Sequence, residues 1–339
     1  MTTQPDYSRL VFTPVEASNA TELYVKELRE NDGDGMPLYI PKMEYNPQDG
    51  KGFLPVKRGE IITVLGRPGN GKTGFMLRWA RARSKDLRKQ AAMGNATAAN
   101  SVVLYWTMEQ LVEELRLFHV AAERGISATD MANGKLEDVK WDEVTNTLRN
   151  LHTDPLWFAG KSMRRRRDKI RLNEQALYGA LQSIETWQGD EVKTQIDCVF
   201  VDYLQRFRSN GQEWVQFYGD LMNALKDMAG DFATRFIVGI QARREVDSRD
   251  VPIPQMDDGQ WTSSIEQQSD GMISVVRPSH YKNKGEEFDG VTVIGHTQMV
   301  VAVLKRKLGP ENFKAWVNFH PEYNRLDEAE LKNFNPNEV

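Results

Sequence analysis

Short apolar runs alternate with helix-like stretches along the chain from Gly59 onward. Helical patterns occur, for example, at residues 74–88 and 111–124. Six apolar runs have the length of a buried strand and contain β-branched or aromatic residues: 61–65, 101–106, 198–201, 236–240, 272–276 and 299–304. Continuous apolar strands separated by helices are typical of a sheet that is buried on both faces. The pattern therefore predicts an α/β fold with a mostly parallel sheet flanked by helices.

Before Gly59 the pattern is less regular. Residues 22–30 are predicted to form a short helix, and the segments 31–37 and 46–52, which contain Gly, Asp, Asn and Pro, interrupt regular structure after it. The segment 89–100 is expected to be a surface connection. We therefore expect three parts: an arm or linker, residues 1–58; one large domain, residues 59–326; and a tail, residues 327–339.

The charges are nearly balanced. With 44 basic and 48 acidic residues the net charge is −4, so the chain lacks the positive excess of a strongly basic nucleic-acid-binding protein, although local basic clusters still permit DNA binding. One cysteine, Cys198, cannot form an intramolecular disulfide and is expected to be a small buried hydrophobe in a reducing cytoplasm. No run of about 18 apolar residues occurs, so no membrane span is expected. The N-terminus lacks the pattern of a secretory signal.

The strongest chemical signal is 66-GRPGNGKT-73, which matches the phosphate-binding pattern G-x-x-x-x-G-K-[ST] between an apolar strand and a helical pattern. Its glycines allow backbone N–H groups to surround phosphate oxygens, and the following helix adds its positive end. Lys72 is predicted to reach the terminal phosphates of ATP, and the Thr73 hydroxyl to ligate Mg²⁺. The predicted ATP-binding residues are Gly66, Arg67, Pro68, Gly69, Asn70, Gly71, Lys72, Thr73 and Gly74.

Three further polar side chains stand where predicted strands end. Asp202 follows the apolar run 198–201 and is predicted to hold Mg²⁺ through water. Glu109 is predicted to activate or position the attacking water, or else to cap the next helix. Gln241 is predicted to contact the γ-phosphate, or else to be an ordinary turn residue. Ligands bind beyond the carboxyl ends of parallel strands, so we expect these groups to converge with Lys72 on one catalytic site.

Together these motifs resemble the DnaB-type replicative DNA helicases, which are RecA-like P-loop ATPases. Four segments carry the resemblance and occur in the family's order: 59–73, 202–205, 263–278 and 305–310. The resemblance covers residues 59–326, which correspond to the family's motor domain. It implies an ATP-hydrolysing hexameric ring around single-stranded DNA that unwinds duplex DNA with 5′–3′ polarity. It also implies replication partners such as a primase or a loader.

The resemblance gives a role to the basic turn formed by Lys305, Arg306 and Lys307. In the family ATP lies between subunits, and basic residues of a neighbour contact its γ-phosphate; Lys305 and Lys307 stand at those positions. The family has Arg where this chain has Lys307, so either Lys307 substitutes for it or Arg306 takes the role through a shifted register. A solvated turn without a catalytic role is the other interpretation.

The resemblance also bears on the residues before the large domain. About 58 residues precede it, and the family's separate helical N-terminal domain is not expected to fit there. The stretch 22–30 is expected instead to act as a linker helix that docks on the next subunit.

In RecA-like motors the loops that follow the Asp and Gln strands face the channel of the ring. The basic residues in these loops are predicted to contact the DNA backbone without reading sequence, or else to be ordinary surface residues: Arg206, Arg208, Arg243, Arg244 and Arg249. The run 164–171 is the densest basic cluster, and we expect it to bind nucleic acid, a neighbour's acidic patch or only water. Trp214, Phe217 and Tyr218 have helical spacing, which favours core packing over base stacking.

Three functions compete on these grounds. The first is an ATP-driven motor that translocates on single-stranded DNA and unwinds duplexes. The second is a RecA-like ATPase that acts as a nucleotide-dependent switch or loader for a protein partner. The third is a scaffold stabilised by nucleotide, against which the intact set Lys72, Thr73, Glu109 and Asp202 argues. The segments 263–278 and 305–310 favour the motor over the switch.

Overall fold

The computed structural model describes residues 13–30, 35–164, 170–187, 193–207, 213–259 and 262–327. The chain divides into two units, Met1–Met36 and Pro37–Val339, each of which is described by itself. No helix in the described part of the chain is long and apolar enough to cross a membrane.

The first unit contains one helix, α1 (Pro14–Glu30), which begins earlier than the predicted stretch 22–30. Its start is fixed by Thr13 and Glu16. The Thr13 hydroxyl and N–H both donate to the Glu16 carboxylate at 2.7 Å, and the Glu16 N–H donates back to the Thr13 hydroxyl at 3.3 Å. This reciprocal capping pair, with Pro14 in the first turn, is a helix-start signal that apolar periodicity does not reveal.

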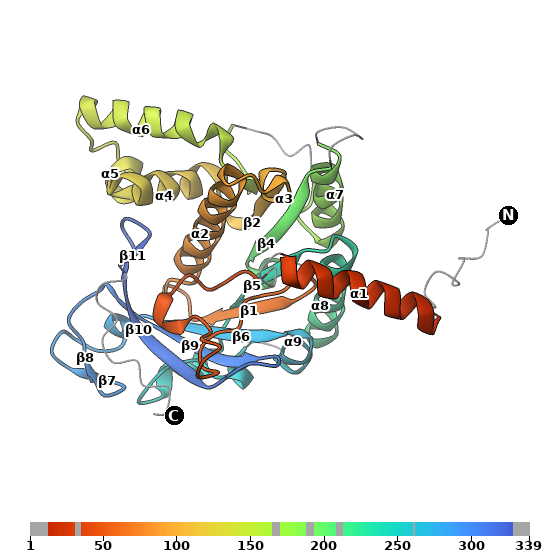
Figure 1. Ribbon diagram of the computed structural model, residues 1–339. Coiled ribbons are helices and arrows are strands. Elements are labelled where there is room, and N and C mark those ends of the chain that lie inside the picture. Colours follow the sequence, from red (N-terminus) through yellow and green to blue (C-terminus); the bar gives the residue numbers. More distant parts are fainter. Residues whose placement is uncertain are drawn as a thin grey trace. The chain divides into compact units, whose positions relative to one another are not determined.

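Nine strands of the described chain form one sheet in the second unit, in the order β11-β10-β9-β6-β1-β5-β4-β2-β3 (Figure 1). Their bounds are β1 Ile61–Gly66, β2 Ser101–Leu111, β3 Leu156–Lys161, β4 Gln195–Asp202, β5 Arg235–Gln241, β6 Gly271–Val276, β9 Gln298–Arg306, β10 Phe313–His320 and β11 Arg325–Asp327. From β6 to β3 neighbouring strands are parallel, whereas β9, β10 and β11 are added in antiparallel pairs. The predicted α/β fold with a mostly parallel sheet is confirmed.

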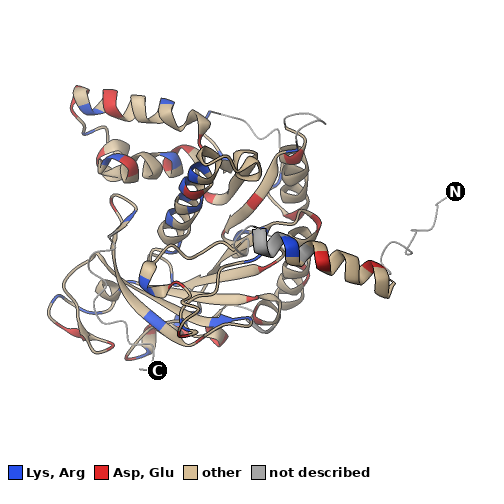
Figure 2. Ribbon diagram, viewed as in Figure 1, with Lys and Arg blue, Asp and Glu red and all other residues tan. Residues whose placement is uncertain are grey.

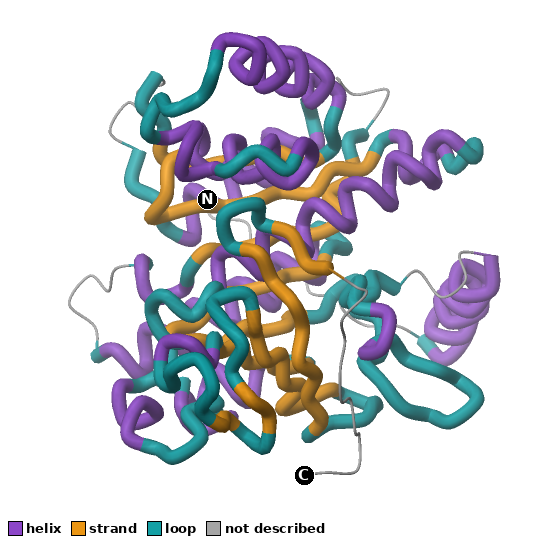
Figure 3. The backbone as a smooth tube through the Cα atoms, turned by 90° about the vertical axis from the view of Figure 1, so that its left-hand side faces the viewer, coloured by secondary structure: helices purple, strands orange, loops and turns teal. Residues whose placement is uncertain are grey.

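Helices cover both faces of this sheet (Figures 1 and 3). The main ones are α2 (Lys72–Ala92) on one face and α7 (Glu174–Glu185) with α8 (Trp214–Asp231) on the other. The remaining helices are α3 Ala96–Ala99, α4 Val112–Arg124, α5 Ala128–Ala132, α6 Asp138–Asn150 and α9 Thr262–Gln268. Short 3₁₀ turns are η2 Pro41–Met43, η3 Leu151–Thr153, η4 Leu204–Arg206, η5 Arg244–Ser248, η6 Met256–Asp258 and η7 Pro278–His280, and a separate hairpin joins β7 Glu287–Phe288 to β8 Val291–Thr292.

The two cores explain why the strands are apolar throughout. On the α2 face, Trp79 packs edge-on against Phe200 of β4 with ring centroids 6.0 Å apart. On the α7–α8 face, the neighbours Val199 and Val201 join a second apolar cluster with residues of α7 and α8. Successive residues of a strand thus enter opposite cores, which buries both faces of the sheet. Cys198 is fully buried on β4, as the sequence predicts.

The second unit begins earlier than the predicted domain boundary at residue 58. The Pro37 carbonyl accepts a hydrogen bond from the indole of Trp79 at 2.8 Å, and Phe53 packs on the same indole at 6.2 Å between ring centroids. Residues 37–58 therefore fold with the sheet instead of forming part of the arm. The expected surface connection 89–100 also differs, since α2 continues to Ala92 and Asn95 caps the short helix α3.

Candidate active site

The predicted phosphate loop lies between the end of β1 and the start of α2. Gly69 and Gly71 have φ of +80° and +86°, a backbone region that strongly favours glycine. A Cβ on Gly71 would lie 2.6 Å from the Cε of Met299. The loop therefore needs glycine both for its shape and for its close contacts, and it places the amino end of α2 beside the space that it encloses.

Lys72 and Asp202 form the buried charged centre of this site. Lys72 is 9% exposed, and its Nζ lies 4.3 Å from the ring centroid of Tyr203. Burial lowers the pKa of Lys72 to about 8, although Asp202 and Glu109 oppose the shift. Burial likewise raises the pKa of Asp202 above its usual value, while Lys72 and a hydrogen bond with Thr73 oppose it. Both charges are destabilised by desolvation, as is common at functional sites.

The surroundings of Asp202 suit a magnesium ion. Tyr105 donates a hydrogen bond from its hydroxyl to Asp202 Oδ2 at 3.0 Å. The other oxygen, Oδ1, is buried and has no hydrogen-bond partner among the described residues. An unsatisfied carboxylate oxygen beside the Thr73 hydroxyl offers the oxygen ligands that Mg²⁺ prefers, with phosphate oxygens and water completing the shell.

Glu109 lies within β2, because the strand continues to Leu111. Its side chain is 47% exposed and forms an ion pair with Arg206. The alternative role of helix cap belongs to Glu114, which accepts a hydrogen bond from the Leu111 N–H at 3.2 Å. Glu109 is thus an exposed carboxylate at the mouth of the site.

Gln241 ends β5 directly beside the phosphate loop, since it pairs with Gly66 of β1. Its N–H donates to the side-chain oxygen of Gln205 at 3.1 Å. Thr107 of β2 pairs in turn with Asp202 of β4. The strands β1, β5, β4 and β2 are adjacent in the sheet, so Lys72, Gln241, Asp202 and Glu109 come together from four neighbouring strand ends.

The basic turn lies at the opposite end of the strands. Arg306 pairs with Gly271, which pairs with Ile62 near the start of β1, whereas the phosphate loop follows Gly66. Four residues of strand at about 3.3 Å each separate the two levels by about 13 Å. Within one chain, the turn and the phosphate loop therefore stand at opposite edges of the sheet.

The three residues of this turn differ in their surroundings. Arg306 is 3% exposed and donates to the carbonyls of Leu54 and Pro55 and, at 2.8 Å, to Glu60. Lys305 donates to the Glu266 carbonyl at 2.7 Å, while Lys307 is 60% exposed with its Nζ 3.5 Å from Asp270. Arg306 is enclosed by its own chain, which does not fit the interpretation that it reaches a neighbouring subunit.

The arginines predicted to contact DNA are only partly available. Arg206 pairs with Glu109, and Arg249 forms two hydrogen bonds with Asp258, the longer at 2.7 Å. Arg243 and Arg244 lie in the segment after β5. Arg208 lies outside the described residues, as do residues 165–169 of the basic run 164–171.

Two other groups bear on nucleic-acid binding. Phe217 and Tyr218 are buried in the core, and the half-exposed Trp214 stacks on Tyr218, so core packing accounts for this aromatic group. Lys and Arg also gather along α2 (Figure 2). There Arg81 and Arg83 are buried, and Arg83 pairs with Asp197 at 2.7 Å, so this helix is not an open basic surface.

Sequence reasoning missed the groups that hold the catalytic residues. Tyr105 orients Asp202, Tyr203 lies against Lys72, and Gln205 holds the Gln241 backbone. Tyr105 stands inside an apolar run, where its hydroxyl gives no sequence signal. The segment 202–205 did signal the other two by its resemblance to a family motif, without indicating their contacts.

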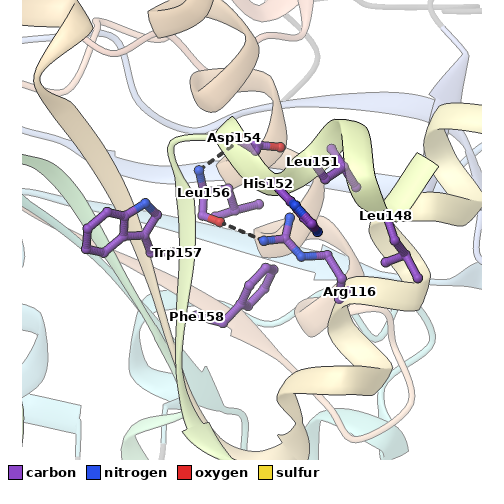
Figure 4. Close-up of a pocket in the computed structure, with 8 residues that line it drawn as sticks. All are labelled: Arg116, Leu148, Leu151, His152, Asp154, Leu156, Trp157 and Phe158. Atoms are coloured by element: carbon purple, nitrogen blue, oxygen red, sulfur yellow. Dashed lines mark hydrogen bonds between the residues drawn. The ribbon is translucent and has the colours of Figure 1, made fainter. Parts of the chain in front are cut away.

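A separate cavity of about 390 Å³ lies beside edge strand β3 (Figure 4). It is lined by Arg116, Leu148, Leu151, His152, Asp154, Leu156, Trp157 and Phe158. Arg116 lies over the Phe158 ring at 4.9 Å and donates to the Leu156 carbonyl at 3.3 Å. None of the residues predicted for catalysis lines this cavity, so the chemistry belongs to the phosphate-loop site.

Comparison with known proteins places this geometry in a family. Residues 51–328 match the family described as the DnaB-like helicase C terminal domain. Over 319 residues the chain is 24% identical to the "Replicative DNA helicase DnaB" of Geobacillus stearothermophilus, covering 91% of this chain and 61% of that protein. It is 23% identical to the "Replicative DNA helicase DnaC" of Bacillus subtilis, covering 91% and 60%. The chain thus spans about three fifths of the length of these relatives.

Solved structures share the fold. One of them, a protein's ATPase domain solved by itself, superposes with a TM-score of 0.71 at 18% identity and covers 92% of this chain and 98% of that one. A DnaB-like replicative helicase, whose structure was described with its interactions with primase, superposes with a TM-score of 0.67, also at 18% identity. It covers 91% of this chain and 65% of that one.

Proposed function

Since the chain belongs to the DnaB-like helicase C-terminal domain family, we propose that it is an ATP-hydrolysing motor that forms a ring, translocates on single-stranded DNA and unwinds duplex DNA. The observation that carries this proposal is the convergence of Lys72, Asp202 and Glu109 at neighbouring strand ends beside a glycine-shaped loop. Unwinding with 5′–3′ polarity and a hexameric ring are the forms of this activity that the resemblance implies.

Each residue has a proposed part in hydrolysis. The loop N–H groups and Lys72 bind and neutralise the β- and γ-phosphates. Thr73 and Asp202 hold Mg²⁺, which supplies positive charge between the phosphates. Glu109 positions and deprotonates the attacking water, and Gln241 contacts the γ-phosphate from the end of β5.

The subunit interface is the second part of the proposal. The basic turn cannot reach the phosphate loop of its own chain, because the two stand at opposite edges of the sheet. We propose that Lys305 and Lys307 contact the γ-phosphate bound by a neighbouring copy, with the exposed Lys307 as the main group. Arg306 is left out of this role because its guanidinium is buried within its own subunit.

Helix α1 and the partners complete the proposal. An amphipathic helix that precedes the motor suits docking on the next subunit, so we assign α1 that role. A primase or a loader is proposed as a further partner. For DNA we propose backbone contacts by Arg243 and Arg244, with Arg206, Arg208 and Arg249 as further contributors.

Binding to DNA gives the first prediction. Affinity for a single-stranded oligonucleotide should fall by about tenfold or more between 50 and 200 mM salt, because each contact to phosphate releases counterions. Fluorescence anisotropy with oligonucleotides of unrelated sequence measures this, and their affinities should be similar. Salt-resistant binding to one short duplex sequence would contradict backbone recognition.

Glu109→Gln gives the second prediction. The substitution keeps the size of the side chain and removes its basicity, so turnover should fall by about 10²-fold while ATP binding is retained. Single-turnover hydrolysis and titration with a fluorescent ATP analogue separate the two effects. Glu113→Gln is the matched control, since Glu113 accepts hydrogen bonds from Ser162 and Met163, away from the site. Lost affinity with unchanged turnover per bound ATP would make Glu109 a structural residue.

The experiment that tests the function is the ATPase rate with and without single-stranded DNA. A motor on DNA should be stimulated by the strand, whereas a switch for a protein partner should not. Turnover that ignores DNA of every length would exclude the proposed motor.

A further inference from the structure

Arg67, the second residue of the phosphate loop, is bonded to the segment that follows β5. Its Nε donates to Asp247 Oδ2 at 2.9 Å, and its Nη2 lies 2.8 Å from the same oxygen. Its Nη1 donates to the Ala242 carbonyl at 3.0 Å, while the Ala242 N–H donates to the Gly66 carbonyl at 3.2 Å. The first half of the phosphate loop is therefore tied to residues 242–247 by a charged pair and by the backbone.

Asn70 ties the second half of the loop to the same carboxylate. This side chain is 2% exposed, and its Oδ1 accepts a hydrogen bond from the Arg277 N–H at 2.8 Å. Its Nδ2 donates to the hydroxyl of Tyr281 at 3.0 Å, and that hydroxyl donates to Asp247 Oδ1 at 3.0 Å. Asp247 thus receives Arg67 on one oxygen and Tyr281 on the other, which closes a ring of hydrogen bonds around the loop.

The segment that carries Asp247 also carries basic residues assigned above to DNA. Arg243 and Arg244 precede it, and Arg249 follows it. The backbone N–H of Arg243 donates to the Asp258 carbonyl at 2.7 Å, and the Arg249 side chain bonds to the Asp258 carboxylate. Residues 242–249 therefore form a short element that is held at both ends and joined in its middle to the phosphate loop.

We propose that Tyr281 and Asp247 are positioning residues that couple occupancy of the phosphate loop to the conformation of residues 242–249, and through them to DNA. The DNA half of this inference rests on the proposed function. A triphosphate that settles in the loop fixes Arg67 and Asn70, and both transmit their position to Asp247. Because coupling between two sites is reciprocal, DNA held by residues 243–249 restrains the loop in return.

Hydrogen exchange on the full chain tests the coupling without DNA. A non-hydrolysable ATP analogue should slow exchange of peptides within 242–249 by about fivefold or more, the lower end of usual coupling factors. Tyr281→Phe removes the hydroxyl and keeps the ring, which lies 6.4 Å from Phe288 between centroids. In this variant and in Asp247→Asn, most of the protection at 242–249 should disappear, although the analogue still slows exchange at 66–74. Tyr178→Phe on α7 removes a hydroxyl outside the network and should behave as the wild type.

The double variant separates a shared network from two structural defects. If Tyr281 and Asp247 act through the same bonds, Tyr281→Phe/Asp247→Asn should lose no more protection than Asp247→Asn alone. Equal protection at 242–249 in the wild type and in Tyr281→Phe, or its absence in the wild type, would overturn the coupling. Stimulation of the ATPase by DNA is measured on the same proteins. A wild type that shows the nucleotide effect but no DNA stimulation would refute the motor and retain the coupling.

Discussion

Replacing Lys72 with alanine is expected to reduce ATP hydrolysis to the background level, a loss of about 10³-fold or more for a charge that faces the transferring phosphoryl group. The ammonium is buried beside Asp202 and is the main positive charge of the loop in the described structure. Its removal leaves the triphosphate without a counter-charge and Asp202 without its ion partner. A coupled-enzyme ATPase assay at saturating ATP measures the loss.

Folding must be monitored in the same variant, because Lys72 is buried. Circular dichroism and thermal unfolding should resemble those of the wild type, since the loop lies at the surface end of β1. Lys85→Ala, on the same helix, removes a half-exposed lysine that pairs with Glu123 at 2.7 Å and should leave turnover unchanged. Normal turnover by Lys72→Ala would refute the assignment of the phosphate loop.

A similar loss, again about 10³-fold, is expected for Lys307→Ala if this residue completes the site of a neighbouring copy. Its side chain is 60% exposed, so the substitution should not disturb folding. Activity of the wild type should also rise faster than linearly with protein concentration, because subunits must assemble before any site is complete. Lys305→Ala, tested in parallel, separates the two lysines.

Mixing two inactive variants tests the shared site. The Lys72→Ala subunit supplies an intact basic turn, and the Lys307→Ala subunit supplies an intact phosphate loop. A mixed ring contains some interfaces with both, so partial activity should return. Arg306 stays unchanged in this experiment, because removing one partner of its buried pair with Glu60 would destabilise the subunit. Nearly full activity of both Lys305→Ala and Lys307→Ala would mean that the turn is only solvated.

The sequence predicted the sheet well because its central strands are buried on both faces. Runs such as 236–240 are apolar at every position and cannot be mistaken for a surface segment. Edge strands lack this signal. The strand β10 alternates buried and half-buried positions and includes Lys314 and Asn318, and it was not predicted. The site residues were predictable because each ends a central strand, and parallel strands bring their carboxyl ends to one edge.

The direction of a side chain could not be read from the sequence. Arg306 and Lys307 are adjacent and both basic, yet one is buried against Glu60 and the other is exposed. Successive residues at the end of a strand point to opposite sides, and only the packing of residues 54–60 decides which of the two is enclosed. The same holds for Arg67 and Asn70, whose partners Asp247 and Tyr281 lie far along the chain.

Strand displacement on a forked DNA duplex tests the proposed motor most directly. The wild-type protein should release the labelled strand in the presence of ATP and Mg²⁺, and should release none with a non-hydrolysable analogue. The Lys72→Ala variant should bind the fork and release no strand. Hydrolysis of ATP by the wild type without displacement on forks of either polarity, at concentrations where the protein is assembled and bound to the DNA, would contradict a helicase and favour a nucleotide-dependent switch.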